Sequence, residues 1–347
     1  MAAVRGFKMR ETLRTTFRDI LKKIDLTEVM LELSAVADVA IDHSLSVVRT
    51  SLRETYGDPA GEAFAVISLG KLGGEELNFS SDVDLLFVYR GDGEDGGTTR
   101  REQFTRRAER LVRLLGEQTA DGFCFRVDLN LRPEGRNGPL ARSLGSCREY
   151  YRRWSEPWEA QALLRAEPVA GDVDLGRRFV ALIDPLRYPP GGVPESDVRE
   201  IRRLKARMEA ERLPRGADPG LHTKLGRGGL SDVEWVAQLL TLRHGHAVPG
   251  LRTTRTLPAL AAAVEAGLLD PEDAAHLVSA WRIATRVRDA VMLVRGRAGD
   301  MVPTDARDLA AVSQVLGYRP GESGALLDDY RRVTRRARGV VERVFYA

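Results

Sequence analysis

A glycine-rich turn followed closely by two aspartates at the head of an apolar run constrains this chain more than any other feature. The turn, GKLGG, covers residues 70–74, and the run DVDLLFV begins at Asp82. Before the turn, residues 63–69 read AFAVISL, a short apolar segment rich in β-favouring side chains. This segment predicts a buried strand that ends in the glycines, and residues 82–88 predict a second strand. The chain is therefore expected to contain a sheet with glycines and carboxylates at neighbouring strand ends.

The two aspartates of this motif are placed to act together. Side chains alternate between the faces of a strand, so Asp82 and Asp84 are expected to point the same way, with Val83, Leu85 and Phe87 in packing. Adjacent carboxylates repel each other and lose solvation, which makes them poor structural elements unless a cation lies between them. Mg²⁺ suits such a pair, because it binds one or two carboxylates together with phosphate oxygens. A solvated turn is the alternative, but glycines and acids this close between two apolar strands favour the Mg²⁺ site.

The glycines supply the other half of this predicted site. Gly73 and Gly74 can adopt backbone dihedral angles closed to other residues, and their N–H groups can approach a phosphate chain. A carboxylate-bound cation beside a phosphate-facing turn predicts a site for a metal–nucleotide complex.

A third strand with one polar face is predicted at residues 123–132, FCFRVDLNLR. Its apolar side chains alternate with Arg126, Asp128, Asn130 and Arg132, as in a strand with one face in the core. If it lies beside the aspartate strand, Asp128 becomes a third carboxylate that shares the metal or helps to deprotonate an acceptor. Arg126 and Arg132 could then bind phosphates bidentately. An ordinary solvated sheet face is the alternative.

At these residues the chain resembles the glutamine synthetase adenylyltransferase (adenylyl-removing) family. The resemblance is carried by GKLGGEELNFSSDVDLLFVY, DGFCFRVDLNLRPEGRNGPL and KLGRGGLSDVEW, and softer similarity covers most of the 347 residues. It implies an α/β nucleotidyltransferase domain related to the polymerase β palm, with a mixed sheet, followed by an all-α helical bundle domain. It also implies Mg²⁺-dependent transfer of AMP from ATP to a tyrosine of glutamine synthetase, or phosphorolytic removal of that AMP to give ADP.

The resemblance also implies roles for individual residues. The metal carboxylates would be Asp82 and Asp84, with Asp128 as the third. Gly73 and Gly74 would form the phosphate-facing turn, with Ser81 beside it. The implied protein partner is glutamine synthetase, and the PII signalling protein is a further candidate.

One departure from the family pattern leaves the direction of the reaction open. Members usually carry two nucleotidyltransferase units, one for each direction, and this chain has one. The segment ELNFSSD is more similar to the adenylyl-removing half of family members. The segment YYRRWSEPWEAQALLRAEPVAGD is more similar to the adenylyl-adding half. Two other functions stay open: a PII uridylyltransferase-like protein nucleotidyltransferase, and a non-catalytic ATP-binding regulatory fragment.

Composition narrows the class of protein. With 53 basic and 50 acidic residues the net charge is +3, which gives little reason to expect nucleic acid or a membrane as a partner. Two cysteines, Cys124 and Cys147, fit a reducing cytoplasm and argue against a disulfide scaffold or a zinc site. No secretory signal is visible in the first residues.

The pattern along the chain predicts three parts. Residues 1–58 form an N-terminal helical lead, residues 59–187 the nucleotidyltransferase domain, and residues 188–347 a helical bundle domain. Prolines and glycines between residues 185 and 194 mark the linker. In the last part, residues 231–234 predict a capping box that opens a helix at Trp235, and the glycine-rich segment 224–229 predicts a flexible basic loop.

Overall fold

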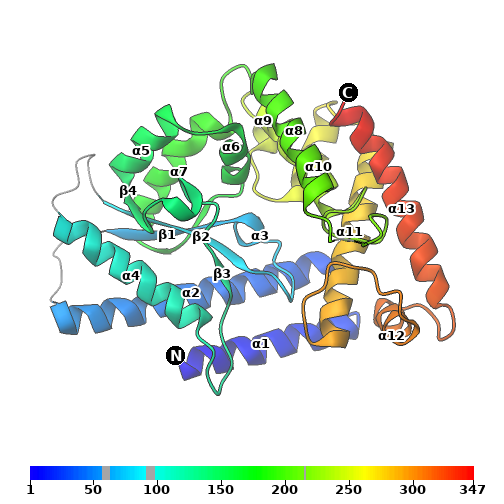
Figure 1. The fold of residues 1–347 in the computed structure, drawn as a ribbon, viewed down its shortest axis with the longest axis horizontal. Helices are drawn as coiled ribbons and strands as arrows, with labels where there is room; N and C mark the ends of the chain where they lie inside the picture. The colour runs from blue at the N-terminus through cyan, green and yellow to red at the C-terminus, as the bar shows by residue number, and fades with distance from the viewer. Residues whose placement is uncertain (57–62, 91–97, 215) are drawn as a thin grey trace. The chain divides into compact units, whose positions relative to one another are not determined.

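The chain divides into two compact units in a computed structural model that describes residues 1–56, 63–90, 98–214 and 216–347 (Figure 1). The first unit comprises residues 1–77 and 81–186, and the second comprises residues 78–80 and 187–347. The first unit is mixed α/β and includes both N-terminal helices. The second unit is helical over its described residues. No helix in the described residues combines the length and apolar character that crossing a membrane requires.

A small mixed sheet forms the centre of the first unit. Its strands are β1 (Phe64–Leu69), β2 (Val83–Tyr89), β3 (Val127–Asp128), β4 (Ala141–Ser143) and β5 (Glu167–Gly171). The order is β3-β2-β1-β5, with β4 also paired to β2. Strand β1 is antiparallel to β2 and β5, whereas β2 is parallel to β3 and β4. All six residues of β1 are buried, so the buried strand predicted before the glycines is confirmed.

Helices cover both faces of this sheet (Figure 1). One face packs Ile67, Leu86 and Val88 against α5 (Leu144–Arg153) and α7 (Val173–Arg187) in a single hydrophobic cluster. On the other face the rings of Phe64 and Phe87 stack at a centroid distance of 5.9 Å. That face is covered by α2 (Leu26–Tyr56) and α4 (Thr98–Gly116), while α1 (Ala2–Ile20) packs on α2. The short helices α3 (Gly70–Gly73), η1 (Gly135–Asn137) and α6 (Pro157–Leu163) complete the unit.

The ten-residue strand predicted at 123–132 is wrong, because only Val127 and Asp128 pair as a strand. After Asp128 the chain turns: the Asp128 carboxylate accepts a hydrogen bond from the Asn130 N–H at 2.7 Å, which bends the backbone out of the sheet. Before the strand, the alternation is also inverted, since Cys124 is fully buried while Phe123 is only half-buried. Local side-chain interactions therefore override the period-2 pattern here.

Helix α1 turns an apolar face outward. Its large exposed side chains are Met9, Leu13, Phe17 and Ile20, followed by Leu21 at the helix end, with exposed fractions between 44% and 68%. These residues recur at helical spacing, and the face that they mark lies on the surface of the first unit.

The second unit contains α8 (Glu195–Glu211), α9 (Leu230–His244), η2 (Pro249–Leu251), α10 (Thr256–Glu265), α11 (Pro271–Arg295), α12 (Ala306–Leu316) and α13 (Ser323–Val344). Helix α11 packs against α9, α10, α12 and α13, and its Trp281 is fully buried. The capping box predicted at residues 231–234 is wrong. The N-cap is Gly229, and Asp232 lies inside α9 as part of a buried charged cluster instead.

Candidate functional site

Two of the three predicted carboxylates are neighbours in the sheet. Asp84, the second residue of β2, has Asp128 of β3 as its paired residue in the parallel register. Paired residues of adjacent strands project from the same face, and adjacent strands lie about 4.8 Å apart. The structure thus brings Asp84 and Asp128 together at the end of the sheet where β1 ends and both of their strands begin.

A glycine that the sequence analysis passed over makes room for Asp84. Gly70 has φ +55°, and a Cβ atom built on it would lie 2.1 Å from the Asp84 Oδ2 atom. Any side chain at residue 70 would therefore displace the Asp84 carboxylate. The signal was present, since Gly70 is the first glycine after the apolar strand, but its neighbour across the sheet could not be identified from local sequence.

Of the other two glycines of the turn, Gly73 has a packing role and Gly74 forms a backbone hydrogen bond. A Cβ on Gly73 would lie 1.7 Å from the Arg165 carbonyl oxygen, so the turn and the segment just after α6 approach too closely for any side chain. The Gly74 N–H donates to the Gly70 carbonyl at 3.2 Å. A buried ion pair between Arg165 and Glu76, at 3.0 Å, fixes the same segment. The phosphate-facing role of Gly73 and Gly74 stays a prediction.

Asp82 lies just before β2 and is engaged by Arg126. The Arg126 Nε atom donates to Asp82 Oδ1 at 2.5 Å, and the two side chains are 54% and 47% exposed. The backbone reinforces this approach, because the Val83 N–H donates to the Arg126 carbonyl at 2.9 Å. Arg126 therefore lies beside the carboxylates, paired with one of them.

Arg132 organises the loop that follows β3. Its guanidinium donates to the carbonyl oxygens of Leu129, at 2.7 Å, and of Gly138. Burial lowers the pKa of Arg132, against the opposing effect of Asp128. The structure thus gives Arg132 a structural role near the carboxylates, and Ser81 lies half-buried directly before Asp82.

The donor set fits a hard divalent cation. Asp82, Asp84 and Asp128 offer only carboxylate oxygens, the ligands that Mg²⁺ prefers, and Gly70 provides the space that the central carboxylate occupies. Within the residues described, no three His, Cys, Asp or Glu side chains converge as a metal-binding group. Asp82 Oδ1 accepts a hydrogen bond from Arg126, and Asp128 Oδ1 accepts one from the Asn130 N–H.

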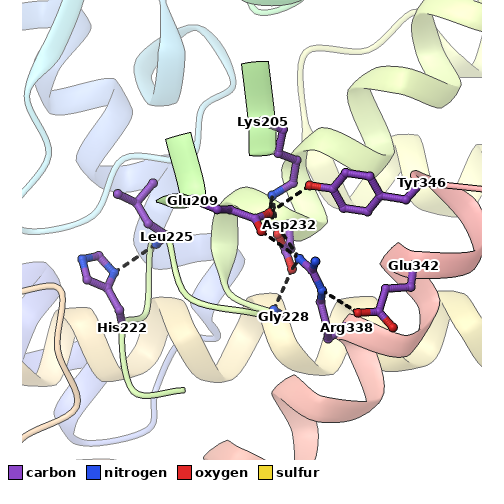
Figure 2. A network of polar contacts seen from close by, with 9 residues as sticks. All are labelled: Lys205, Glu209, His222, Leu225, Gly228, Asp232, Arg338, Glu342 and Tyr346. Atoms are coloured by element: carbon purple, nitrogen blue, oxygen red, sulfur yellow. Dashed lines mark hydrogen bonds and ion pairs between the residues drawn. The ribbon is translucent and has the colours of Figure 1, made fainter. Parts of the chain in front are cut away.

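The second unit contains a buried charged cluster beneath the KLGRGGLSDVEW motif (Figure 2). Lys205 of α8 forms ion pairs with Asp232 and, at 2.6 Å, with Glu209, and Arg338 of α13 contacts both carboxylates at 3.1 and 3.2 Å. Burial alone would raise the pKa of Glu209, but Lys205 and Arg338 hold it below its usual value. The Tyr346 hydroxyl donates to Glu209 at 3.1 Å. The cluster therefore ties α8, α9 and α13 together.

This cluster also holds the glycine-rich loop, which the sequence analysis predicted to be flexible. The Gly228 N–H donates to Asp232 at 2.7 Å, and a Cβ on Gly228 would lie 1.9 Å from the Thr334 carbonyl oxygen. The imidazole Nδ1 of His222 accepts the Leu225 N–H at 3.0 Å (Figure 2). The prediction of a flexible loop is wrong, because buried side chains bind its backbone at several points.

Comparisons with known proteins match a different family model to each of two parts of the chain. The family model for glutamate-ammonia ligase adenylyltransferase matches residues 1–181, and that for GlnD PII-uridylyltransferase matches residues 200–345. Three relatives share the name bifunctional glutamine synthetase adenylyltransferase/adenylyl-removing enzyme. Those of Streptomyces avermitilis and Streptomyces coelicolor are 55% and 54% identical over 100% of this chain and 36% of their own length. That of Mycobacterium tuberculosis is 48% identical over 99% of this chain and 34% of its own length. The chain thus spans about a third of the length of these relatives.

Proposed function

Because this chain belongs to the glutamate-ammonia ligase adenylyltransferase family, we propose that it transfers AMP from ATP to a tyrosine of glutamine synthetase, or removes that AMP by phosphorolysis. The observation that carries the proposal is the pairing of Asp84 with Asp128 across parallel strands, beside the space that Gly70 leaves. Carboxylates in this position suit a reaction at a metal-bound triphosphate. The first unit would be a polymerase β palm-like nucleotidyltransferase domain.

The proposed metal ligands are Asp82, Asp84 and Asp128. When bound, Mg²⁺ would neutralise charge on the triphosphate and on the leaving oxygen. Arg126 would position phosphate oxygens through its guanidinium. The tyrosine acceptor has a pKa of roughly 10, so Asp128 would assist its deprotonation near neutral pH.

The nucleotide would lie between these acids and the turn before them. The proposed nucleotide-binding residues are Gly73, Gly74, Ser81, Arg126 and Arg132. Support for Arg126 is its position beside Asp82, whereas Arg132 would act by holding the loop after β3 in place.

A second candidate function is protein uridylylation. It is favoured by the match of residues 200–345 to the PII-uridylyltransferase family model, which also makes the PII protein a candidate partner. The two functions differ in base and acceptor, so competition between ATP and UTP for binding separates them.

Intact-mass spectrometry of glutamine synthetase tests the proposal. Unmodified substrate is incubated with the chain and Mg-ATP, and adenylylated substrate with Mg²⁺ and phosphate. A gain of one AMP per subunit would establish addition, and a loss with release of ADP would establish removal. Asp84→Asn is the control and should lose either activity while keeping its helical circular dichroism. Equal activity of the Asp84→Asn variant would overturn the assigned site.

A further inference from the structure

We propose that Arg126 is a latch that competes with the metal for Asp82 and is released when a nucleotide triphosphate binds its guanidinium. The inference rests on the proposed function, since it takes Asp82 as a metal ligand. It adds a coupling between nucleotide and metal that the assignment of ligands alone does not contain.

The competition between Arg126 and the metal is inferred from the atom that Arg126 binds, which is a carboxylate oxygen of Asp82. The Arg126 Nε donates to Asp82 Oδ1 at 2.5 Å, so the guanidinium neutralises the charge of a carboxylate that a cation would bind. A guanidinium and a divalent cation that share one carboxylate also repel each other. Binding of the ion through Asp82 is therefore weakened while Arg126 stays paired with it.

The pair is weak enough to open. Both side chains are about half exposed, at 54% and 47%, and exposed ion pairs typically contribute about 0.2–1 kcal/mol. Such an interaction delays metal binding without preventing it. A buried pair, like that of Arg165 with Glu76, could not act in this way because it is costly to separate.

The backbone keeps Arg126 next to the site in both states. The Val83 N–H donates to its carbonyl at 2.9 Å, and Val83 pairs with Val127 in the sheet. On the other side, the Lys8 ammonium lies 5.3 Å and 5.0 Å from the ring centroids of Phe123 and Phe125. With its backbone bonded to Val83, Arg126 stays beside the site when its side chain changes partner.

A triphosphate offers the guanidinium a better partner than one carboxylate. Arginine binds phosphate oxygens bidentately, and charge-assisted pairs of this kind are stronger than single ones. Nucleotide that takes Arg126 from Asp82 frees the metal ligand, so nucleotide should raise metal affinity. By linkage, the metal should raise nucleotide affinity by the same factor.

Titration calorimetry with Mn²⁺ as the probe tests the latch, with and without a non-hydrolysable ATP analogue. Without nucleotide, Arg126→Gln should bind Mn²⁺ more tightly than wild type, by a factor of up to about five, the equivalent of a surface ion pair. In the variant the analogue should raise Mn²⁺ affinity less than it does in wild type, and Arg126→Lys should lie between the two. The gain should shrink at high salt, which screens exposed pairs.

A matched control is Arg152→Gln, which removes an arginine from the exposed pair with Glu149 and changes net charge equally. It should leave Mn²⁺ affinity unchanged. Equal Mn²⁺ affinity in wild type and Arg126→Gln, with the same enhancement by nucleotide, would overturn the latch and leave the proposed function standing. Absence of Mn²⁺ binding in wild type as well as in Asp84→Asn would overturn the metal site and the latch together.

Discussion

Removing Lys205 should destabilise the second unit more than removing the charge of its partner Asp232. The side chains of Lys205 and Asp232 are 3% and 1% exposed, so water cannot solvate either charge if its partner is removed. Lys205→Met keeps the length of the side chain and deletes only its ammonium. Asp232→Asn keeps the shape of the carboxyl group and deletes only its charge.

The difference follows from the charges of the cluster. Two cations, Lys205 and Arg338, face three carboxylates, Asp232, Glu209 and Glu342, which gives a formal charge of −1. Lys205→Met leaves the cluster with a formal charge of −2 around the buried Asp232 carboxylate. Breaking a buried ion pair in this way lowers the free energy of unfolding by about 3–5 kcal/mol. Asp232→Asn leaves a neutral cluster, and its amide oxygen can still accept the Gly228 N–H. Its cost should be about 1–3 kcal/mol, that of a weakened buried hydrogen bond.

Combining the two changes sharpens the test. The double variant Lys205→Met with Asp232→Asn again has a formal charge of −1, so it should be more stable than Lys205→Met alone. Such non-additivity is expected only for residues that interact directly.

Thermal unfolding measures these differences. The second unit has 164 residues, 3 in residues 78–80 and 161 in residues 187–347, and each kcal/mol shifts Tm by about 2–4 °C in a unit of this size. Hydrogen exchange of peptides from α9 and α13 assigns the loss to this unit. If Asp232→Asn proved less stable than Lys205→Met, the charge argument would be refuted.

Three other changes test the first unit. Gly70→Ala places a Cβ 2.1 Å from Asp84 Oδ2 and should weaken Mn²⁺ binding at least tenfold with little loss of helicity, measured by calorimetry and circular dichroism. Gly73→Ala meets a backbone carbonyl at 1.7 Å and should cost about 1–3 kcal/mol in urea unfolding, as overpacking does. Burial and a nearby carboxylate raise the pKa of Asp38 to about 7, and its Oδ1 is buried without a hydrogen-bond partner among the described residues. A raised acid pKa stabilises the fold below the unfolded value and loses that contribution as pH rises to about 7. Asp38→Asn should therefore raise Tm at pH 8 and leave it nearly unchanged at pH 3.5; an equal gain at both pH values would refute the assignment.

The parts of the fold that were predictable depend on local pattern. The apolar run before the glycines predicted β1, and the run after Asp82 predicted β2, because a short buried strand leaves a continuous apolar segment. The proximity of Asp128 to Asp84 was predicted only on the condition that their strands pair, and the register meets that condition.

The parts that were missed depend on contacts distant in sequence. Asp232 fits a capping pattern, yet its surroundings come from α8 and α13, whose residues lie 27 and 106 positions away. The strand after Phe123 ends early because Asp128 bonds to its own neighbouring backbone. Gly70 is explained only by a carboxylate on the next strand.

The outward face of α1 has a calorimetric consequence. Met9, Leu13, Phe17, Ile20 and Leu21 are 44% to 68% exposed in the folded chain, so unfolding adds less new apolar hydration at these positions than at buried ones. Unfolding typically raises the heat capacity by about 12–15 cal/mol/K per residue, and apolar exposure supplies the positive part. These five positions should therefore contribute less to the heat-capacity change of unfolding than buried apolar residues do.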